Sequence, residues 1–324
     1  MSCKDTFYDL QRLSLMDIFT NRKLSSMLAV CIPVFNTDVT RLVNELSRQK
    51  DQLEYPVEII LIDDGSDVKF KKINEQVKSK VKYILLDRNI GRSKIRNLFL
   101  KYTQSEYLLF IDNDLLIMSD NYISNYISLI EKENNNVVCG GHVYDFYPPS
   151  RDKLLRWKYG TTKESQPVEL RNKHPYRSFM TGNFLIKRKI LEEIPFDARV
   201  TGYGHEDTLF GFQLKRRGIN IKHVHNPVLS KELDDNAEYL RKTEQGILNL
   251  IKVLAYADHD PGFIEDVTLL RVYYKLSSYR LIWIVSILFR LTRSLLKRIL
   301  LRGVAGMRLF GFYKLGVLVV NYRK

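Results

Sequence analysis

Short apolar runs alternate with stretches of helical spacing through the first half of the chain, and this alternation limits its fold more than any other feature. The apolar runs, each of strand length, occupy residues 27–33, 57–63, 81–86, 107–111 and 137–143. Amphipathic stretches separate these runs. They are residues 37–49, a stretch that follows Gly65-Ser66 and ends at 78, residues 92–103, and residues near 121–131. Strands that alternate with helices of this length form a mostly parallel sheet with helices on both faces. The sequence therefore predicts a doubly wound, Rossmann-like α/β domain.

The rest of the chain divides into a loop, further regular structure and a tail. Residues 145–175 lose the alternation and are rich in Pro, Tyr, Arg and Lys, which predicts a long functional loop. Regular structure resumes at 179–187, and a helix at 206–217 ends at Gly218. A strand at 219–224 and a helix at 236–255 complete a domain that we place at residues 27–255. An N-terminal segment, 1–26, precedes it, and a helical basic tail, 256–324, follows.

Three acidic signatures stand at places where an apolar strand would end. They are Asp63-Asp64-Gly65-Ser66, Asp112-Asn113-Asp114 and Gly202-Tyr203-Gly204-His205-Glu206-Asp207. The carboxyl ends of parallel strands form the ligand-binding edge of an open α/β sheet. Two carboxylates one residue apart can approach one ion, and their oxygens suit Mg²⁺ or Mn²⁺ on a diphosphate better than zinc. This pattern indicates a nucleotide-diphosphate substrate.

Composition excludes several classes of protein. An apolar share of 45% with 11% aromatic residues is that of a folded globular protein. Three widely spaced cysteines, Cys3, Cys31 and Cys139, form no metal-binding pattern and predict a reducing cytoplasm. Residues 1–26 contain no apolar core of a signal peptide, which argues against secretion.

The basic character of the chain belongs to its tail. Residues 271–324 contain 12 Lys or Arg and no Asp or Glu, so only +2 of the net charge of +14 remains for the other residues. The longest uncharged apolar stretch, 281–289, is shorter than the roughly 20 residues that span a bilayer. One helical face carries Leu288, Leu291, Leu295 and Ile299, and the opposite face carries Arg290, Arg293 and Lys297. Such a helix favours an anionic membrane surface.

Two other partners are open to this tail. A helical hairpin would pack on the domain at residues 27–255 or on a second copy of the chain, which would make a homodimer. A basic stripe with Tyr273, Tyr274, Tyr279 and Tyr313 also fits nucleic acid. Leucines that alternate with the arginines favour lipid, so we predict no nucleic-acid partner.

Taken together, the motifs of residues 27–255 resemble the family 2 glycosyltransferases, which have the GT-A fold. The shared elements are Ile32-Pro33-Val34-Phe35-Asn36, Asp63-Asp64-Gly65-Ser66, Asn89-Ile90-Gly91 leading to Arg96-Asn97, Asp112-Asn113-Asp114, Thr181-Gly182-Asn183 and the 202–207 element. The last also resembles the G-x-G-x-E-D element of galactosyltransferase-type acceptor domains. Six elements in this order make the resemblance specific.

The resemblance implies a nucleotide site along the strand ends. Asp64 would accept a hydrogen bond from N3–H of uracil, and Asp112 would hold the ribose or a metal-bound water. Gly91 would let the backbone approach the nucleotide, and Arg92 and Arg96 would bind the diphosphate. For these arginines a solvated helix face is the alternative. The nucleotide-binding candidates are Pro33, Asn36, Asp64, Gly91, Arg92, Arg96, Asp112 and Asn113.

The resemblance also implies catalytic, metal and acceptor residues. Asp207 would be the catalytic base, and Glu206 would position the base or the acceptor. Asp114 would ligate the metal with Asp112, but the histidine that relatives place a few residues after an Asn-Pro-Val is replaced here by Ser230-Lys231-Glu232. Either His225 or an additional water would then complete the metal shell. The acceptor-binding candidates are Gly182, Asn183 and Gly204.

We therefore predict an inverting, metal-dependent glycosyltransferase with Mn²⁺ or Mg²⁺ as its cofactor. It would move a hexosyl or N-acetylhexosaminyl group from a UDP-linked donor to a glycan or lipid-linked glycan, in surface polysaccharide biosynthesis. Its expected location is cytoplasmic, at the inner face of the cell membrane. A nucleotide-sugar or membrane-binding protein without catalysis is the alternative, but it leaves the 202–207 element without a function.

Overall fold

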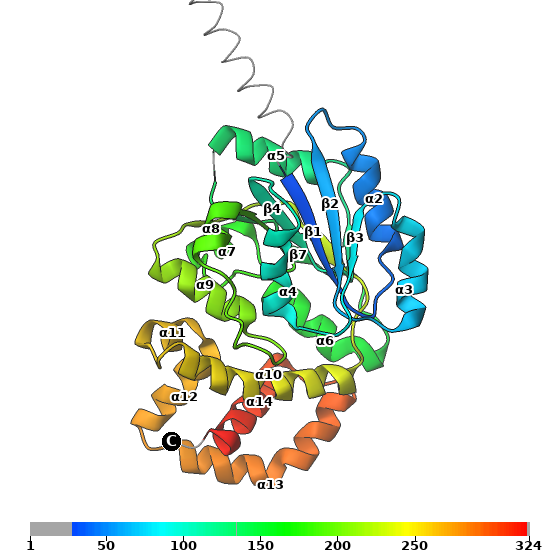
Figure 1. Cartoon of the computed structure of the whole chain (residues 1–324). Helices are drawn as coiled ribbons and strands as arrows, with labels where there is room; N and C mark the ends of the chain where they lie inside the picture. Colours follow the sequence, from blue (N-terminus) through cyan, green and yellow to red (C-terminus); the bar gives the residue numbers. More distant parts are fainter. Residues whose placement is uncertain (1–27, 134, 323–324) are drawn as a thin grey trace, which may run out of the picture.

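A seven-stranded sheet forms the centre of the molecule (Figure 1). The computed structural model describes residues 28–133 and 135–322. In spatial order the strands are β3 (Lys82–Leu85), β2 (Val57–Asp63), β1 (Leu28–Val34), β4 (Tyr107–Ile111), β8 (Asn183–Lys187), β6 (Val137–Cys139) and β9 (Ile221–His223). Of these seven, β8 runs antiparallel to both of its neighbours, and the other pairs are parallel. The predicted mostly parallel α/β sheet is confirmed, with one reversed strand.

Alternate residues of β1 face two different layers of helices. Leu28 and Val30 share a core with α2 (Thr40–Lys50) and α5 (Tyr122–Glu133). Ala29 and Cys31 lie in the core on the other side. That second core includes residues of α4 (Arg92–Leu98), α8 (Arg188–Glu193) and α9 (Glu206–Arg216). Because helices cover both faces, the central strands read as nearly continuous apolar runs.

A small second sheet places distant segments next to the end of β4. Its strand β10 (Val228–Ser230) lies antiparallel to β5 (Leu115–Ile117) and parallel to β7 (His142–Val143). Ser230 pairs with Leu115, the residue that follows Asp114. The polar turn after β4 is thereby surrounded by chain from two later parts of the sequence.

Residues 145–175, predicted to be a loop, are largely helical. They contain a 3₁₀ turn (Arg151–Lys153), α6 (Leu154–Tyr159), a π-helical turn (Gly160–Glu164) and α7 (Val168–Lys173). Leu155 is fully buried, and its N–H donates a hydrogen bond to Asn236 Oδ1 over 2.9 Å. The loop prediction is wrong because helices this short depend on their tertiary partners and show no extended periodicity.

The C-terminal helices share a hydrophobic core with the end of the catalytic domain. They are α11 (Pro261–Asp266), α12 (Thr268–Ser278), α13 (Ile282–Leu301) and α14 (Met307–Asn321), and they pack against α10 (Asn236–Tyr256). In Figure 1, α12, α13 and α14 lie below α10. Leu250 of α10 is buried in the same cluster as Phe289 of α13 and Phe310 and Tyr313 of α14. A boundary near residue 256 therefore does not separate two independent cores.

The sequence analysis also made predictions about an N-terminal segment and about membrane-spanning stretches. The N-terminal segment, residues 1–26, lies outside the described residues. Across 28–133 and 135–322, none of the helices combines the length and the apolar character needed to cross a membrane.

Candidate active site

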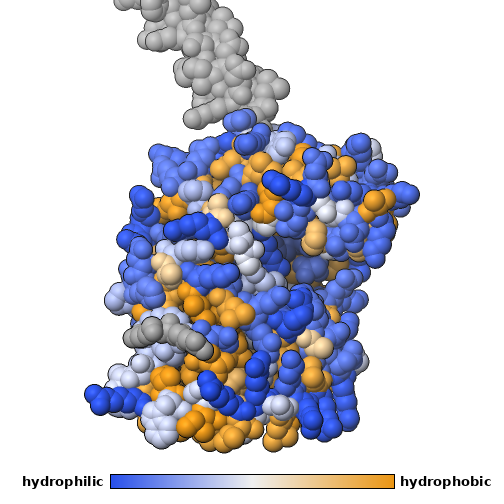
Figure 2. Space-filling view, turned by 60° about the horizontal axis from the view of Figure 1, so that its bottom comes forward, coloured by the Kyte–Doolittle hydropathy of each residue, from blue (hydrophilic) through white to orange (hydrophobic). Residues whose placement is uncertain are grey.

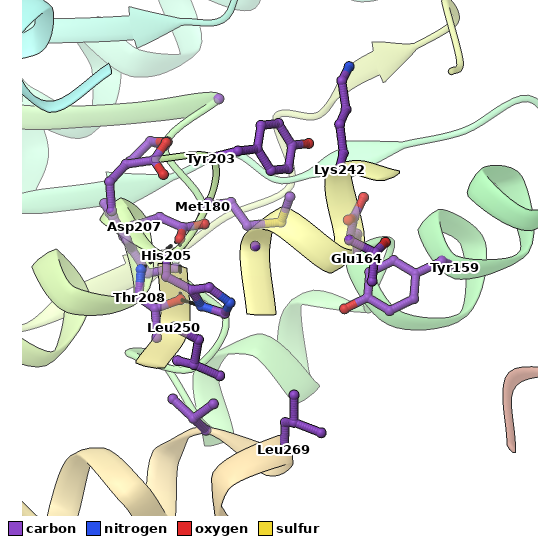
Figure 3. A pocket seen from close by; sticks show the side chains of 18 of the residues that line it. Tyr159, Glu164, Met180, Tyr203, His205, Asp207, Thr208, Lys242, Leu250 and Leu269 are labelled. Atoms are coloured by element: carbon purple, nitrogen blue, oxygen red, sulfur yellow. Dashed lines mark hydrogen bonds between the residues drawn. The ribbon is translucent and has the colours of Figure 1, made fainter. Parts of the chain in front are cut away.

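A pocket lies where the carboxyl end of β4 meets the N-terminus of α9. Its volume is about 560 Å³, within the range of roughly 300–1,000 Å³ common for small-molecule sites. Its charged lining includes Arg92, Asp112, Asp114, Glu206 and Asp207. Figure 3 shows Tyr203 and Asp207 on one side of the pocket, with Tyr159 and Glu164 on the other. Two of the three acidic signatures thus meet in one pocket.

The Asp112-Asn113-Asp114 turn follows β4 directly. The Asp112 N–H donates to the Gly182 carbonyl over 3.1 Å. Asp114 is exposed within the pocket. The pocket walls desolvate its carboxyl and Asp112 adds a like charge, which together raise the pKa of Asp114 to about 6. A bound divalent cation would relieve this repulsion between the two carboxylates.

Arg96 is a buried link behind the pocket. Its side chain is 2% exposed, its Nη2 donates to Asp112 Oδ1 over 3.0 Å, and its Nη1 lies 3.4 Å from Glu206 Oε1. Arg92, one helical turn earlier, is 53% exposed, lines the pocket and lies 3.6 Å from the same Glu206 oxygen. The structure separates the two arginines predicted to bind the diphosphate. Arg92 faces the pocket, whereas Arg96 is committed to carboxylates inside the protein.

Asp207 lies in the first turn of α9, where the helix dipole favours a carboxylate. Its Oδ1 accepts hydrogen bonds from the N–H and the hydroxyl of Thr208 at 2.7 and 3.2 Å. Desolvation, together with the neighbouring charge of Glu206, raises the pKa of Asp207 to about 6. A carboxylate with a pKa in this range is suited to accept a proton near neutral pH.

The first acidic signature lies in the loops beside the pocket. Asp64 accepts hydrogen bonds from the N–H groups of Ile90 and Gly91 at 2.7 and 3.1 Å, one to each carboxylate oxygen. Burial raises the pKa of Asp64, and these two bonds oppose the rise. Because each carboxylate oxygen has more than one lone pair, Asp64 keeps the capacity to accept a further hydrogen bond.

Two predicted nucleotide-binding residues, Pro33 in β1 and Asn36 just after this strand, join this loop region. The Asn36 N–H donates to Ser66 Oγ, and Asn36 Oδ1 accepts from the Asp67 N–H, both over 2.8 Å. Pro33 lies one strand over from Ile62 in the parallel register of β1 and β2. The ends of both strands are therefore tied together next to Asp64.

The side chain of Asn183, which was predicted to contact an acceptor, forms its hydrogen bonds within the protein. It is 1% exposed. Its Oδ1 accepts from the hydroxyls of Tyr122 and Tyr126 at 2.6 and 2.7 Å, and its Nδ2 donates to the carbonyls of Gly141 and Asn226 at 2.9 Å each. All the hydrogen-bonding positions of the amide are occupied, which leaves no atom for an acceptor. The prediction for Asn183 is wrong, and the other two acceptor candidates, Gly182 and Gly204, do line the pocket.

His142, to which the sequence assigned no role, lies beside Asp112. A Cβ on Gly182 would lie 2.6 Å from His142 Cε1 and 3.0 Å from Asp112 Oδ2, so both groups crowd the same glycine. His142 Nε2 is buried without a hydrogen-bond partner among the described residues, and burial lowers the pKa of the imidazole. The available signal was its position near the end of the predicted strand 137–143, at the ligand-binding edge of the sheet.

His225 does not fit the predicted metal site. It is exposed, and the pocket is lined instead by Ser230, which β10 places next to Leu115. In the part of the chain that the structure describes, no three His, Cys, Asp or Glu side chains are gathered to hold a metal ion. Two carboxylates completed by water and substrate phosphates are a common way to hold Mg²⁺, and Asp112 and Asp114 fit that pattern.

The opposite wall comes from segments that the sequence assigned to a loop and a tail. Arg156 pairs with Glu164 over 2.9 Å. Lys314 of α14 lies over the ring of Tyr159, 4.7 Å from its centre, and desolvation lowers the pKa of this lysine to about 8. The C-terminal helices therefore help to build the pocket.

Comparison with known families identifies the class of protein that carries this site. The family model described as glycosyl transferase family 2 matches residues 29–195. The chain belongs to glycosyl transferase family 2. It is thus a glycosyltransferase, as the motifs at its strand ends indicated.

Relatives in this family match different shares of their own length. The uncharacterized glycosyltransferase YfnE of Bacillus subtilis (strain 168) is 25% identical over 70% of this chain and 73% of its own. A chondroitin synthase of Escherichia coli is 24% identical over 69% of this chain but only 37% of its own. This chain therefore corresponds to one part of that larger synthase.

Solved structures of low sequence identity share the fold. A mannosyltransferase from Pyrobaculum calidifontis, in complex with GDP-Man and Mn²⁺, aligns with a TM-score of 0.55 over 92% of this chain and 86% of its own, at 13% identity. Glucosyl-3-phosphoglycerate synthase from Mycobacterium tuberculosis, in complex with Mn²⁺, UDP-glucose and phosphoglyceric acid, gives 0.50 over 72% and 80%, at 15% identity. The GT-A fold expected from the sequence is confirmed.

Proposed function

We propose that this glycosyltransferase moves a sugar, with inversion, from a UDP-linked donor to a hydroxyl of a glycan acceptor, with the help of a divalent cation. The observation that best supports the proposal is the arrangement of Asp112, Asp114, Arg92 and Asp207 around one pocket. Asp112 and Asp114 suit a cation that binds a diphosphate, and Arg92 suits the diphosphate itself. Asp207 suits a hydroxyl that must lose its proton. Direct displacement by that hydroxyl needs no nucleophile from the enzyme.

The base of the donor would lie against the loops that Asp64 holds together. A carboxylate there accepts the N3–H of uracil, and Asp64 retains a lone pair for it. Among proteins of the same fold, the mycobacterial synthase was solved with UDP-glucose and the Pyrobaculum enzyme with GDP-Man. Sugars linked to UDP and to GDP therefore both belong in the test, and we expect the donor to be UDP-linked.

Asp112 and Asp114 would hold Mn²⁺ or Mg²⁺ together with the donor diphosphate. A cation bound there stabilises the negative charge that develops on the leaving group. Arg92 faces the same pocket and adds a fixed positive charge. The two neighbouring structures named above were solved with Mn²⁺.

Asp207 would take the proton from the attacking acceptor hydroxyl. Its pKa, about 6, is still low enough for it to be mostly ionised at neutral pH, and it is a stronger base than an ordinary carboxylate. Glu206 is buried against Arg96, so we assign it the positioning of the first turn of α9. The acceptor would enter beside α10, where Lys242 of that helix offers a polar contact and Leu269 of α12 an apolar one (Figure 3). A glycan or lipid-linked glycan fits such a mixed wall, as in surface polysaccharide assembly.

The proposal is tested by a screen of UDP- and GDP-linked sugars for slow donor hydrolysis, with Mn²⁺, with Mg²⁺ and with a chelator. We expect turnover of a UDP-sugar that depends on the added cation. Once an acceptor is found, proton NMR of the product gives the anomeric configuration, which should be opposite to that of the donor. Equal turnover in the chelator, or a retained configuration, would overturn the corresponding part of the proposal.

A further inference from the structure

The outer side of α13 carries large apolar side chains that the rest of the protein leaves uncovered. They are Trp283, Ile284, Ile287, Leu288, Leu291 and Leu295, with exposed fractions between 36% and 79%. Residues spaced by three or four positions share one side of a helix, so these six form one continuous surface, here called the outer face of α13. The inner side of the same helix is already buried, through Phe289, Leu296 and Leu300. The helix therefore has a second apolar surface, beyond the one that its own core requires.

Basic side chains border this outer face. Arg280, Arg290, Arg298 and Arg302 are all exposed. The sequence from residue 271 to 324 contains no Asp or Glu that would neutralise them. Figure 2 brings this end of the molecule forward and shows hydrophobic and hydrophilic surface side by side. A partner for this face must accept both apolar contact and positive charge.

We propose that the outer face of α13 docks on the surface of an anionic lipid bilayer, with the helix lying in the plane of the interface. A basic amphipathic helix binds there by burying its apolar side chains among the lipids while its cations meet the headgroups. Trp283 is suited to this boundary because tryptophan has an apolar ring and a polar N–H. Arginines close to the apolar side chains reach the headgroups through their long stems.

A second copy of this chain is the competing partner, and the charges disfavour it. A dimer through this face would bring basic segments together, and residues 271–324 offer no acidic side chain to pair with the arginines. The cores of protein–protein interfaces are depleted in charged residues. An anionic bilayer satisfies the arginines and the apolar side chains together.

The experiment measures sedimentation of the full-length protein with phosphatidylcholine vesicles, with and without phosphatidylglycerol, at low salt. It needs neither donor nor acceptor, so its outcome is independent of the proposed reaction. We expect binding to the anionic vesicles alone, weakened by added salt. Arg298→Gln and Arg302→Gln should each weaken binding about fivefold. Lys78→Gln removes an exposed charge from the catalytic domain and should change binding less than about twofold.

A second pair of measurements separates lipid contact from misfolding and from dimerisation. The Leu291→Ser/Leu295→Ser variant should lose about tenfold or more in vesicle binding, with an unchanged circular dichroism spectrum, because both leucines are exposed. The chain has two tryptophans, so in a Trp157→Phe background the emission of Trp283 should shift to shorter wavelength on anionic vesicles. Failure to bind anionic vesicles, or wild-type binding by the α13 variants, overturns the proposal. So does a lipid-free dimer that this double substitution dissociates.

Discussion

Arg96 Nη2 lies 3.0 Å from Asp112 Oδ1, and this bond joins the helix after Gly91 to the end of β4. The same guanidinium lies 3.4 Å from Glu206, so one buried side chain positions residues from two acidic signatures. A buried charge is tolerated only where such partners compensate it. The geometry of the pocket therefore depends on a residue that does not line it.

Replacing Arg96 should destabilise the protein strongly. Arg96→Met leaves the buried Glu206 without its nearest cation, and breaking a buried pair in this way costs about 3–5 kcal/mol of unfolding free energy. Urea denaturation measures the loss. Arg92→Met is the matched control, because the half-exposed Arg92 should change stability by less than about 1 kcal/mol while raising KM for the donor. Equal stability of the two variants would contradict the role given to Arg96.

Asp114→Asn should abolish metal-dependent donor turnover and leave the fold intact. The side chain is exposed in the pocket, so its replacement removes an ion ligand without opening a cavity. Donor hydrolysis across a titration of Mn²⁺ measures the effect, and thermal unfolding checks the fold. Asp51→Asn, at an exposed position after α2, serves as the control and should keep full activity. Wild-type turnover by the Asp114 variant would remove this carboxylate from the metal site.

Asp207→Asn should bind the donor but lose transfer by about 10²–10⁴-fold, the usual contribution of a general base. In the wild type only the ionised carboxylate can accept the proton. Since its pKa is about 6, the rate should fall about tenfold for each pH unit below that value. A pH–rate profile of transfer provides the measurement. A profile that stays flat down to pH 4.5 would assign the base to another group.

The same residue should oppose folding at high pH. The pKa of Asp207 in the folded protein, about 6, lies above its ordinary value of 3.8, so the folded state binds this proton more tightly. The contribution of this carboxyl to stability therefore rises as the pH falls through that window, and it is unfavourable above it. Asp207→Asn should unfold at a higher temperature than the wild type at pH 8, and the difference should shrink toward pH 4. A difference that grows on acidification would have the wrong sign.

Gly65→Ala should destabilise the protein more than Gly91→Ala. Both glycines have positive φ, 76° and 88°, so each substitution carries backbone strain of about 1–3 kcal/mol. A Cβ on Gly65 would in addition lie 2.7 Å from the backbone carbon of Arg88, whereas one on Gly91 meets nothing within 4 Å. Denaturant unfolding of the two variants compares them directly. If Gly91→Ala were the less stable variant, the backbone near Asp64 would have to move to accommodate the Cβ at position 65 at little cost.

Removal of residues 256–324 should yield an insoluble or unfolded protein. The truncation uncovers the side of α10 that buries Ile247, Leu250 and Leu254 against the C-terminal helices. It also removes part of the pocket wall. Soluble yield and the cooperativity of thermal unfolding measure the outcome, with Leu291→Ser/Leu295→Ser as a full-length control. A soluble 1–255 fragment that unfolds cooperatively would establish the tail as a separate unit.

Local sequence patterns predicted those parts of the site that belong to one segment each. The strand that ends at Ile111 and the Asp112–Asp114 pair after it could be read directly, because a buried strand is continuously apolar and its end is marked by polar residues. The short helices of 145–175 could not, since Leu155 is held by Asn236, far along the chain. The same reason applies to His142 and Asn183. The sequence assigned His142 no role, but the structure places it beside Asp112, whereas Asn183, a predicted acceptor contact, forms internal hydrogen bonds. The role of each side chain depends on neighbours that are distant in the sequence.

The sequence by itself determined the α/β class, the strand ends that carry carboxylates, and the membership in glycosyl transferase family 2. Periodicity and short motifs are properties of neighbouring residues, so they survive without coordinates. Only the tertiary structure decided that Arg96 is buried between Asp112 and Glu206, that Asn183 is internal, and that α14 helps to form the pocket. These facts depend on contacts between residues distant in the chain, where burial and charge pairing give each side chain its role. The two apolar sides of α13 illustrate the division, because the sequence showed the leucines and the structure showed which of them remain uncovered.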